Sequence, residues 1–218
     1  METNRSTKEQ LLIAATSLLD KGGPAAVTLR AVGDAIGVSQ TAPNRHFRDK
    51  RDLLESVARE TFREVSEILE GAMRRASSPL EALTLAIREY FELARRFPLR
   101  HRLLFDIGEQ GGLEAEARRA FETVTGLVTA AQHAGQIQEG DSTQMSALIC
   151  STVHGLAQLE QVGSASTVRA LSDVDSLTQL LLGLITNRSR HGQSNARPHS
   201  NDSVRPEAGR AASALSGA

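Results

Sequence analysis

A cysteine and a histidine four residues apart, Cys150 and His154, form the one pair in the sequence that suggests nucleophilic chemistry. On a helix this spacing places both side chains on one face, where an imidazole can favour the reactive thiolate. Nothing nearby is placed to orient the imidazole, and a lone buried cysteine usually packs as a small apolar side chain. An enzymatic function would rest on this pair alone, so we expect the protein not to be an enzyme.

Histidine and cysteine are too sparse for a metal site or a disulfide. The six histidines are scattered over positions 46, 101, 133, 154, 191 and 199, and one cysteine cannot form an internal disulfide. We therefore expect no metal and no cofactor. Residues 1–7 are polar, and no run approaches about 18 apolar residues, so we expect no signal peptide, no membrane span and a cytoplasmic location.

Charge is distributed unevenly along the 218 residues, whose net charge is −1. Residues 1–51 carry a net charge of +3, residues 52–187 a net charge of −7, and residues 188–218 again +3. A basic segment on an acidic body suggests an anionic partner, with nucleic acid as the first candidate. Ordinary variation in surface charge would also give such a difference, so charge does not decide the question.

Residues 28–47 have the spacing of a helix-turn-helix. Gly33 lies where two steeply crossing helices need a small residue, Gly37 suits the positive φ of a tight turn, and Val38 provides an apolar side chain beneath that turn. The second helix of the motif, expected over residues 39–46, is short and begins with small polar residues that can reach base edges in a major groove. The whole pattern predicts DNA binding.

The elements that must position this motif all have helical periodicity, and the fold class we expect is all-α. Ser6 and Glu9 have the spacing of a capping box, as do Ser78 and Glu81 at the start of a later helix. About nine helices are expected, over residues 6–22, 28–37, 39–46, 49–73, 78–96, 98–107, 113–134, 141–159 and 173–185. Residues 188–218 are poor in large apolar side chains, so we expect a disordered tail.

Residues 8–57 resemble the DNA-binding head of TetR-family transcriptional regulators. The resemblance rests on the helix-turn-helix spacing followed by His46, Phe47, Lys50 and Leu53. Weaker similarities to one branch of the family lie at residues 97–105 and in the Val-His-Gly motif of residues 153–157. The resemblance implies a DNA-binding domain over residues 1–48 and a helical ligand-binding and dimerisation domain over residues 49–187.

The resemblance, with side-chain chemistry, implies which residues contact DNA. Arginine and glutamine can pair with guanine and adenine edges, whereas lysine and small polar groups bind phosphates. The candidates for base contact are Gln40, Thr41 and Arg45, and the other DNA-binding candidates are Thr28, Ser39, Asn44, His46 and Lys50. Two positions depart from the family pattern: Pro43 replaces an aliphatic residue, and Asn44 replaces a tyrosine that contacts phosphate.

The resemblance also implies a small-molecule pocket in the body. Four of the seven aromatic residues fall between positions 90 and 105, and one more follows at position 121. The candidate ligand-binding residues are Tyr90, His101, Arg102, Phe105, Phe121, Cys150, His154 and Gln158. Ordinary core packing is the alternative explanation for each of them, and at Cys150 many relatives carry a tryptophan.

Broad apolar faces on the last two expected helices imply a homodimer, as in the family. The expected protein is a repressor that binds a palindromic operator in double-stranded DNA and is released by an unknown small-molecule effector. The helix over residues 49–73 links pocket to head and is the expected lever. The alternative is a helical protein that binds a small molecule or partner and whose head no longer reads DNA, which Asn44 favours.

Overall fold

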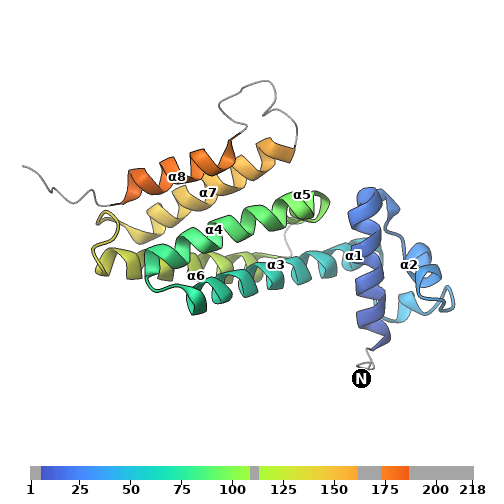
Figure 1. Cartoon of the computed structure of the whole chain (residues 1–218). Coiled ribbons are helices and arrows are strands. Elements are labelled where there is room, and N and C mark those ends of the chain that lie inside the picture. The colour runs from blue at the N-terminus through green and yellow to red at the C-terminus, as the bar shows by residue number, and fades with distance from the viewer. Residues whose placement is uncertain (1–5, 109–112, 162–172, 187–218) are drawn as a thin grey trace, which may run out of the picture. The chain divides into compact units, whose positions relative to one another are not determined.

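A computed structural model describes residues 6–108, 113–161 and 173–186, which form eight α-helices and one 3-10 turn. The described residues hold no strand, only an isolated bridge between Ile137 and Thr186, so the all-α prediction is confirmed. The tail expected over residues 188–218 lies outside the described residues. The elements are α1 (Thr7–Ala26), α2 (Leu29–Ala35), η1 (Pro43–Arg45), α3 (Lys50–Arg75), α4 (Pro79–Arg96), α5 (Pro98–Gly108), α6 (Glu114–His133), α7 (Ser142–Gln161) and α8 (Val174–Ile185) (Figure 1).

Local capping determines where several helices begin. The Ser6 hydroxyl accepts the Glu9 N–H while the Glu9 carboxylate accepts the Ser6 N–H, which confirms the first capping box. The box expected at Ser78 and Glu81 is only half formed. Ser78 accepts the Glu81 N–H, but the Glu81 carboxylate reaches back to the N–H and hydroxyl of Ser77. These hydrogen bonds lower the pKa of the exposed Glu81 carboxyl.

The third expected helix is not an α-helix. Residues 39–46 form turns around η1, in which Arg45 N–H donates to Ala42 and His46 N–H donates to Pro43, each three residues back. Pro43 has no N–H and cannot donate to the carbonyl of Ser39, which removes the α-helical bond that would continue the turn. The prediction of helix over this segment is therefore corrected to a single 3-10 turn.

The two glycines of the motif have the roles that the spacing predicts. A Cβ added at Gly33 would lie 3.1 Å from Cγ of Pro43, so glycine permits the close approach of α2 and η1. Gly37 has a φ of +71° at the turn between them. The helix-turn-helix geometry is therefore encoded at both positions.

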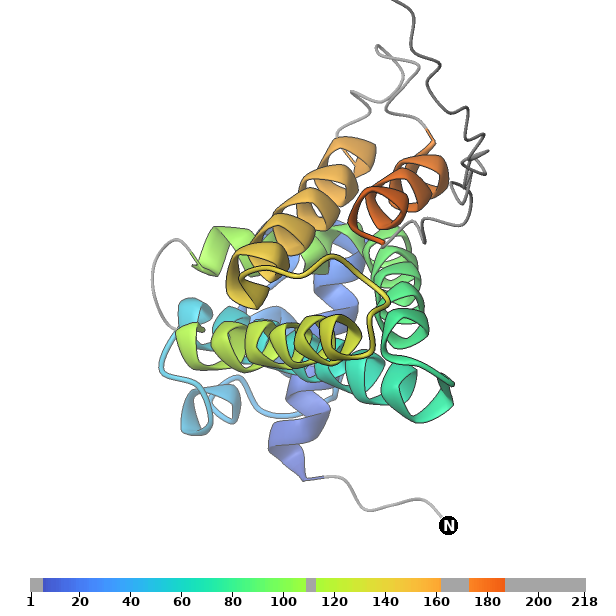
Figure 2. The ribbon, with the colours of Figure 1, turned by 90° about the vertical axis from the view of Figure 1, so that its left-hand side faces the viewer.

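Two apolar cores organise the described helices, and α3 contributes to both. The N-terminal core joins α1, α2, the segment after η1 and the first half of α3 with three residues of α5, namely Leu103, Leu104 and Ile107. The C-terminal core joins the second half of α3 with α4, α6, α7 and α8. Figure 2 shows α7 and α8 side by side, with α3, α4 and α6 packed beneath them.

Candidate DNA-binding surface and ligand cavity

The recognition segment is presented to solvent. All eight residues predicted to contact DNA are exposed, and seven of them lie within α2's cap, the turns around η1 and residue 46. The Thr28 hydroxyl accepts the Ala31 N–H as the cap of α2, and the Ser39 and Thr41 hydroxyls lie 3.2 Å apart. Phe47 is buried in the N-terminal core and Pro43 is buried against Gly33 of α2, while the polar side chains of the segment lie in solvent.

Lys50, the eighth candidate, is the first residue of α3. Two carboxylates lie at this helix end, because Asp49 accepts the Asp52 N–H and Asp52 accepts the Arg48 N–H. Any attraction of Lys50 for phosphate must therefore come from its own ammonium group, because two carboxylates already occupy the helix N-terminus.

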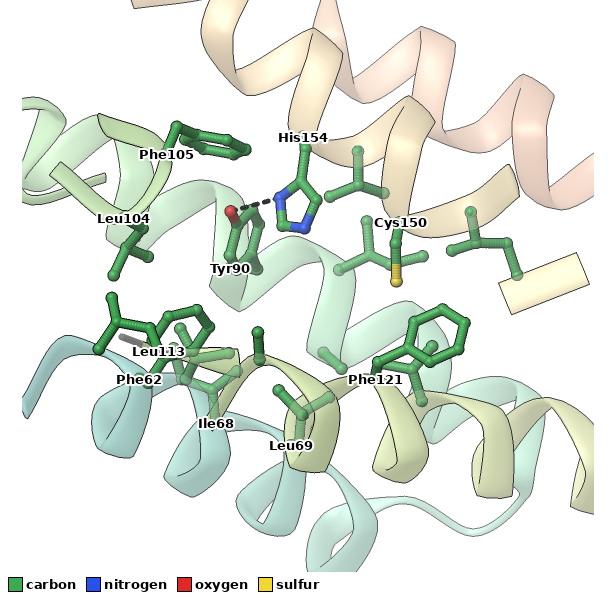
Figure 3. A pocket seen from close by; sticks show the side chains of 18 of the residues that line it. Phe62, Ile68, Leu69, Tyr90, Leu104, Phe105, Leu113, Phe121, Cys150 and His154 are labelled. Atoms are coloured by element: carbon green, nitrogen blue, oxygen red, sulfur yellow. Dashed lines mark hydrogen bonds between the residues drawn. The ribbon is translucent and has the colours of Figure 1, made fainter. Parts of the chain in front are cut away.

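A cavity of about 510 Å³ lies among α3, α4, α5, α6 and α7 (Figure 3). Five of the eight predicted ligand-binding residues line it: Tyr90, Phe105, Phe121, Cys150 and His154. Its volume falls in the range of sites that hold small organic ligands. The structure also adds lining residues that the sequence did not single out, among them Phe62, Ile68, Leu69, Leu104 and Leu113.

The other three predicted residues lie outside the cavity wall. His101 is buried behind Tyr90, with the two rings 5.6 Å apart. Arg102 is exposed and pairs with Asp106 on the surface of α5. Each helical residue turns by about 100° from the one before, so Arg102 points away from the side that His101 occupies. Gln158 is half-buried on α7.

A chain of polar side chains crosses the wall of the cavity. The Tyr90 hydroxyl lies 2.7 Å from Nε2 of His101 and 2.6 Å from Nδ1 of His154. Nε2 of Gln161 lies 3.0 Å from Nδ1 of His101. Gln161 has no signal in the sequence, because a single glutamine near the end of a helix is indistinguishable from a surface residue until α7 packs on α4 and α5.

Burial keeps these groups uncharged. It lowers the pKa of His101 to about 4, helped by repulsion from His154, and it also lowers the pKa of His154. Burial raises the pKa of Cys150 to about 11, so at pH 7 the cysteine is a thiol beside a neutral imidazole. The hydrogen bond of His154 goes to Tyr90 and leaves the thiol unactivated, which argues against nucleophilic chemistry at this pair.

This burial predicts that acid destabilises the protein. Because the His101 pKa is about 4 when folded against an ordinary 6.5, the unfolded chain binds the proton more readily, and stability falls as pH drops below 6.5. Between pH 7 and pH 5.5 we expect His101 to cost about 1 kcal/mol. Urea unfolding at one protein concentration measures it. The variant His101→Gln should have a correspondingly weaker pH dependence, and an unchanged one would contradict the assignment.

Arg100 of α5 pairs with carboxylates of α1 and α3. Its guanidinium lies 2.6 Å from Oδ2 of Asp20 in α1 and 3.0 Å from Oε1 of Glu64 in α3, and 3.7 Å from the ring centre of Phe97. Burial raises the pKa of the Glu64 carboxyl more than the positive charge of Arg100 lowers it. The next residue, His101, contacts the polar chain of the cavity, so α5 connects cavity and head in addition to α3.

Comparisons with known proteins decide the family. Residues 7–57 match the family model of bacterial regulatory proteins of the tetR family. Residues 83–185 match the model of a tetracyclin repressor-like C-terminal domain. The chain belongs to the TetR family. This TetR-family protein is therefore a ligand-responsive, DNA-binding transcriptional regulator rather than an enzyme.

Solved structures have the same fold as this TetR-family regulator. A protein of unknown function from Rhodococcus sp. RHA1 is 25% identical, with a TM-score of 0.72 over 84% of this chain and 97% of that one. A TetR-family transcriptional regulator from Pectobacterium atrosepticum is 24% identical, with a TM-score of 0.68 over 82% and 94%. FadR from Bacillus subtilis, in complex with stearoyl-CoA, is 20% identical, with a TM-score of 0.63 over 81% and 98%. No curated protein matches the sequence of this regulator.

Within residues 6–108, 113–161 and 173–186, no three His, Cys, Asp or Glu side chains are grouped so that they could hold a metal ion. In the same part of the chain, no helix combines the length and apolar character needed to span a membrane.

Proposed function

We propose that this regulator is a cytoplasmic repressor that binds a palindromic operator as a homodimer and is released by a small-molecule effector in the cavity. One observation carries the proposal: α3 and α5 each contribute to the N-terminal core beneath the exposed recognition segment, and each also lines the apolar cavity. A ligand that favours one arrangement of these helices can therefore change DNA affinity by its differential binding to two states.

Apolar effectors fit the cavity. Its wall is formed mainly by aliphatic and aromatic side chains. The FadR structure from Bacillus subtilis holds stearoyl-CoA, and another solved neighbour, 17% identical with a TM-score of 0.61, is a ketosteroid regulator from Mycobacterium tuberculosis. Stearoyl-CoA has a long apolar acyl chain and ketosteroids are largely apolar, which supports an effector with a large apolar part here.

For DNA, we propose that residues 1–48 form the reading domain and residues 49–187 the body. Gln40, Thr41 and Arg45 contact bases, while Thr28, Ser39, Asn44, His46 and Lys50 contact the backbone. Two such heads in one dimer would read half-sites about 34–36 Å apart. Three α5 residues of the proposed body, Leu103, Leu104 and Ile107, pack in the N-terminal core, which supports coupling between body and head.

The proposed dimer forms through α7 and α8. Each helix turns one apolar side into the C-terminal core, with Ile149 and Leu181 buried. Each also leaves large apolar side chains in solvent: Leu148 is 56% exposed, Leu180 58% and Leu184 63%. A second copy that covers these leucines would give the four-helix interface, because packing within one chain accounts for only the buried side.

The substitution Leu184→Ala tests this face. Removing part of its buried apolar area in a dimer should weaken dimerisation by about 1 kcal/mol, or roughly fivefold in Kd. Analytical ultracentrifugation over a range of concentrations measures the change. Met73→Ala, at a residue that is 51% exposed on α3, is the matched control and should leave the dimer constant unchanged. Equal effects of the two substitutions would count against the α7–α8 interface.

A footprint on the DNA beside the protein's own gene, repeated at two salt concentrations, tests the proposed function. A protected palindrome that weakens with salt is the expected result, because phosphate contacts release counterions. Relief of protection by a bound effector would support the repressor mechanism. A folded dimer that protects no DNA, there or in a genome-wide binding selection, would favour the alternative of a helical binding protein whose head no longer reads DNA.

A further inference from the structure

The cavity contains very little that can form a hydrogen bond with a ligand. Of its lining residues, Tyr90, Cys150, His154 and the exposed Glu114 carry polar side chains, and none of the described lining residues is a lysine or arginine. The Tyr90 hydroxyl is already engaged by His101 and His154. Whether the free ring nitrogen of His154 carries a proton therefore decides which kind of ligand atom, a hydrogen-bond acceptor or a donor, can bind at the inner wall.

Gln161 determines which group donates and which accepts along the hydrogen-bond chain. Its amide nitrogen Nε2 lies 3.4 Å from the backbone oxygen of Ala94 and 3.0 Å from Nδ1 of His101. A backbone carbonyl can only accept, so the amide must turn its NH₂ group, and not its oxygen, to this side. The same NH₂ group then donates to Nδ1 of His101, which makes Nδ1 the unprotonated nitrogen of that ring.

The rest of the chain follows from counting protons. A neutral His101 with an accepting Nδ1 carries its proton on Nε2, and this N–H donates to the Tyr90 oxygen at 2.7 Å. The one hydroxyl proton of Tyr90 then goes to Nδ1 of His154 at 2.6 Å. His154, neutral as well, is left with its proton on Nε2. Figure 3 shows this second ring nitrogen directed into the cavity between Tyr90 and Cys150.

We propose that the cavity binds a neutral, largely apolar molecule whose carbonyl oxygen accepts a hydrogen bond from Nε2 of His154. This inference rests on the proposed function, since it takes the cavity as the effector site. An ionised carboxylate at the same place would lose its hydration without gaining a cation from the described wall, which disfavours it. Tyr90, His101 and Gln161 are positioning residues that set the proton on His154.

A matched pair of probes of the same shape tests the acceptor requirement. Benzophenone has a carbonyl oxygen where diphenylmethane has a methylene group, and 4-benzoylbenzoate adds a negative charge. Titration calorimetry on the full-length protein should show benzophenone binding about five- to tenfold tighter than diphenylmethane, as expected for one added hydrogen bond. 4-Benzoylbenzoate should bind more weakly than benzophenone. A hydrocarbon that binds as well as the ketone, or an anion that binds better, would overturn the inference.

Variants test whether the preference for the ketone over the hydrocarbon depends on the hydrogen-bond chain. His154→Phe should abolish the ketone preference, and Tyr90→Phe should reduce it, because Nδ1 of His154 then loses its donor. Thr152→Ala, on the same helix but outside the cavity wall and the hydrogen-bond chain, should keep it. Long-range ¹H–¹⁵N spectra of the wild-type imidazoles provide a measurement that needs no variant. They should show both His101 and His154 protonated at Nε2. A proton on Nδ1 of His154 would overturn the inference, because Nε2 would then accept and the ligand would have to supply a hydrogen-bond donor.

The probe experiments distinguish a failure of the carbonyl requirement from a failure of the proposed function. If both uncharged probes bind equally, the cavity remains a ligand site and only the carbonyl requirement fails. If the ketone binds with the expected preference and never changes operator affinity, the inference holds and the repressor mechanism fails. If neither probe binds, the cavity fails as a site for apolar ligands and both proposals fall.

Discussion

The variant Arg100→Met is expected to lower the free energy of unfolding by about 3 kcal/mol. Methionine keeps most of the apolar stem but removes the positive charge, which leaves Asp20 and Glu64 facing each other across α1 and α3. The Arg100 side chain is only 10% exposed, whereas its partners are 22% and 34% exposed. Since water can partly rehydrate the partners, the cost should lie at the lower end of that for breaking a buried ion pair.

Urea unfolding of the two proteins, at equal concentration and at pH 7, measures this change. Arg102→Met is the matched control: it lies on the same helix, and its pair with Asp106 is 69% and 54% exposed, so its loss should cost less than about 1 kcal/mol. Near-equal stability of Arg100→Met and wild type would show that α5 is held by apolar packing alone. It would also remove Arg100 as a connection between cavity and head.

Much of the fold follows from short-range signals in the sequence. Ser6, Thr28, Asp49 and Asp173 each accept the N–H three residues on, as their side-chain chemistry and position indicate. Helical periodicity likewise placed the long helices to within a few residues. The clearest local failure is the segment around Pro43, where the missing N–H limits the second helix of the motif to a 3-10 turn.

The parts that sequence could not supply depend on contacts between distant residues. Arg100 meets Asp20 at a separation of 80 residues and Glu64 at 36, and Gln161 meets His101 at 60. No local periodicity carries information about such pairs. The cavity wall is ambiguous for another reason. Leu69 and Phe62 fit the apolar face of a helix equally well whether they face a neighbour or an open space, so only packing distinguishes lining from core.

Replacement of Arg45 by alanine should weaken binding to the operator by about 2 kcal/mol, or roughly 30-fold in Kd, if its guanidinium reads a guanine. Arg45 is the last residue of η1 and is exposed, while Pro43 and Phe47 on either side are buried and fix its backbone. A side chain on an anchored backbone loses less conformational freedom on binding, which favours a role in reading bases over a loose contact with phosphate.

Fluorescence anisotropy with the protected operator, and with variants of it changed one base pair at a time, measures both affinity and specificity. For Arg45→Ala the penalty of changing one particular base pair should disappear, because that pair is no longer read. Lys50→Ala is the contrasting control: its loss should weaken binding to all sequences alike and reduce the salt slope by about 1. Should Arg45→Ala behave like Lys50→Ala, Arg45 is a phosphate contact, and base reading must then rest on Gln40 and Thr41, the other two exposed candidates in the segment.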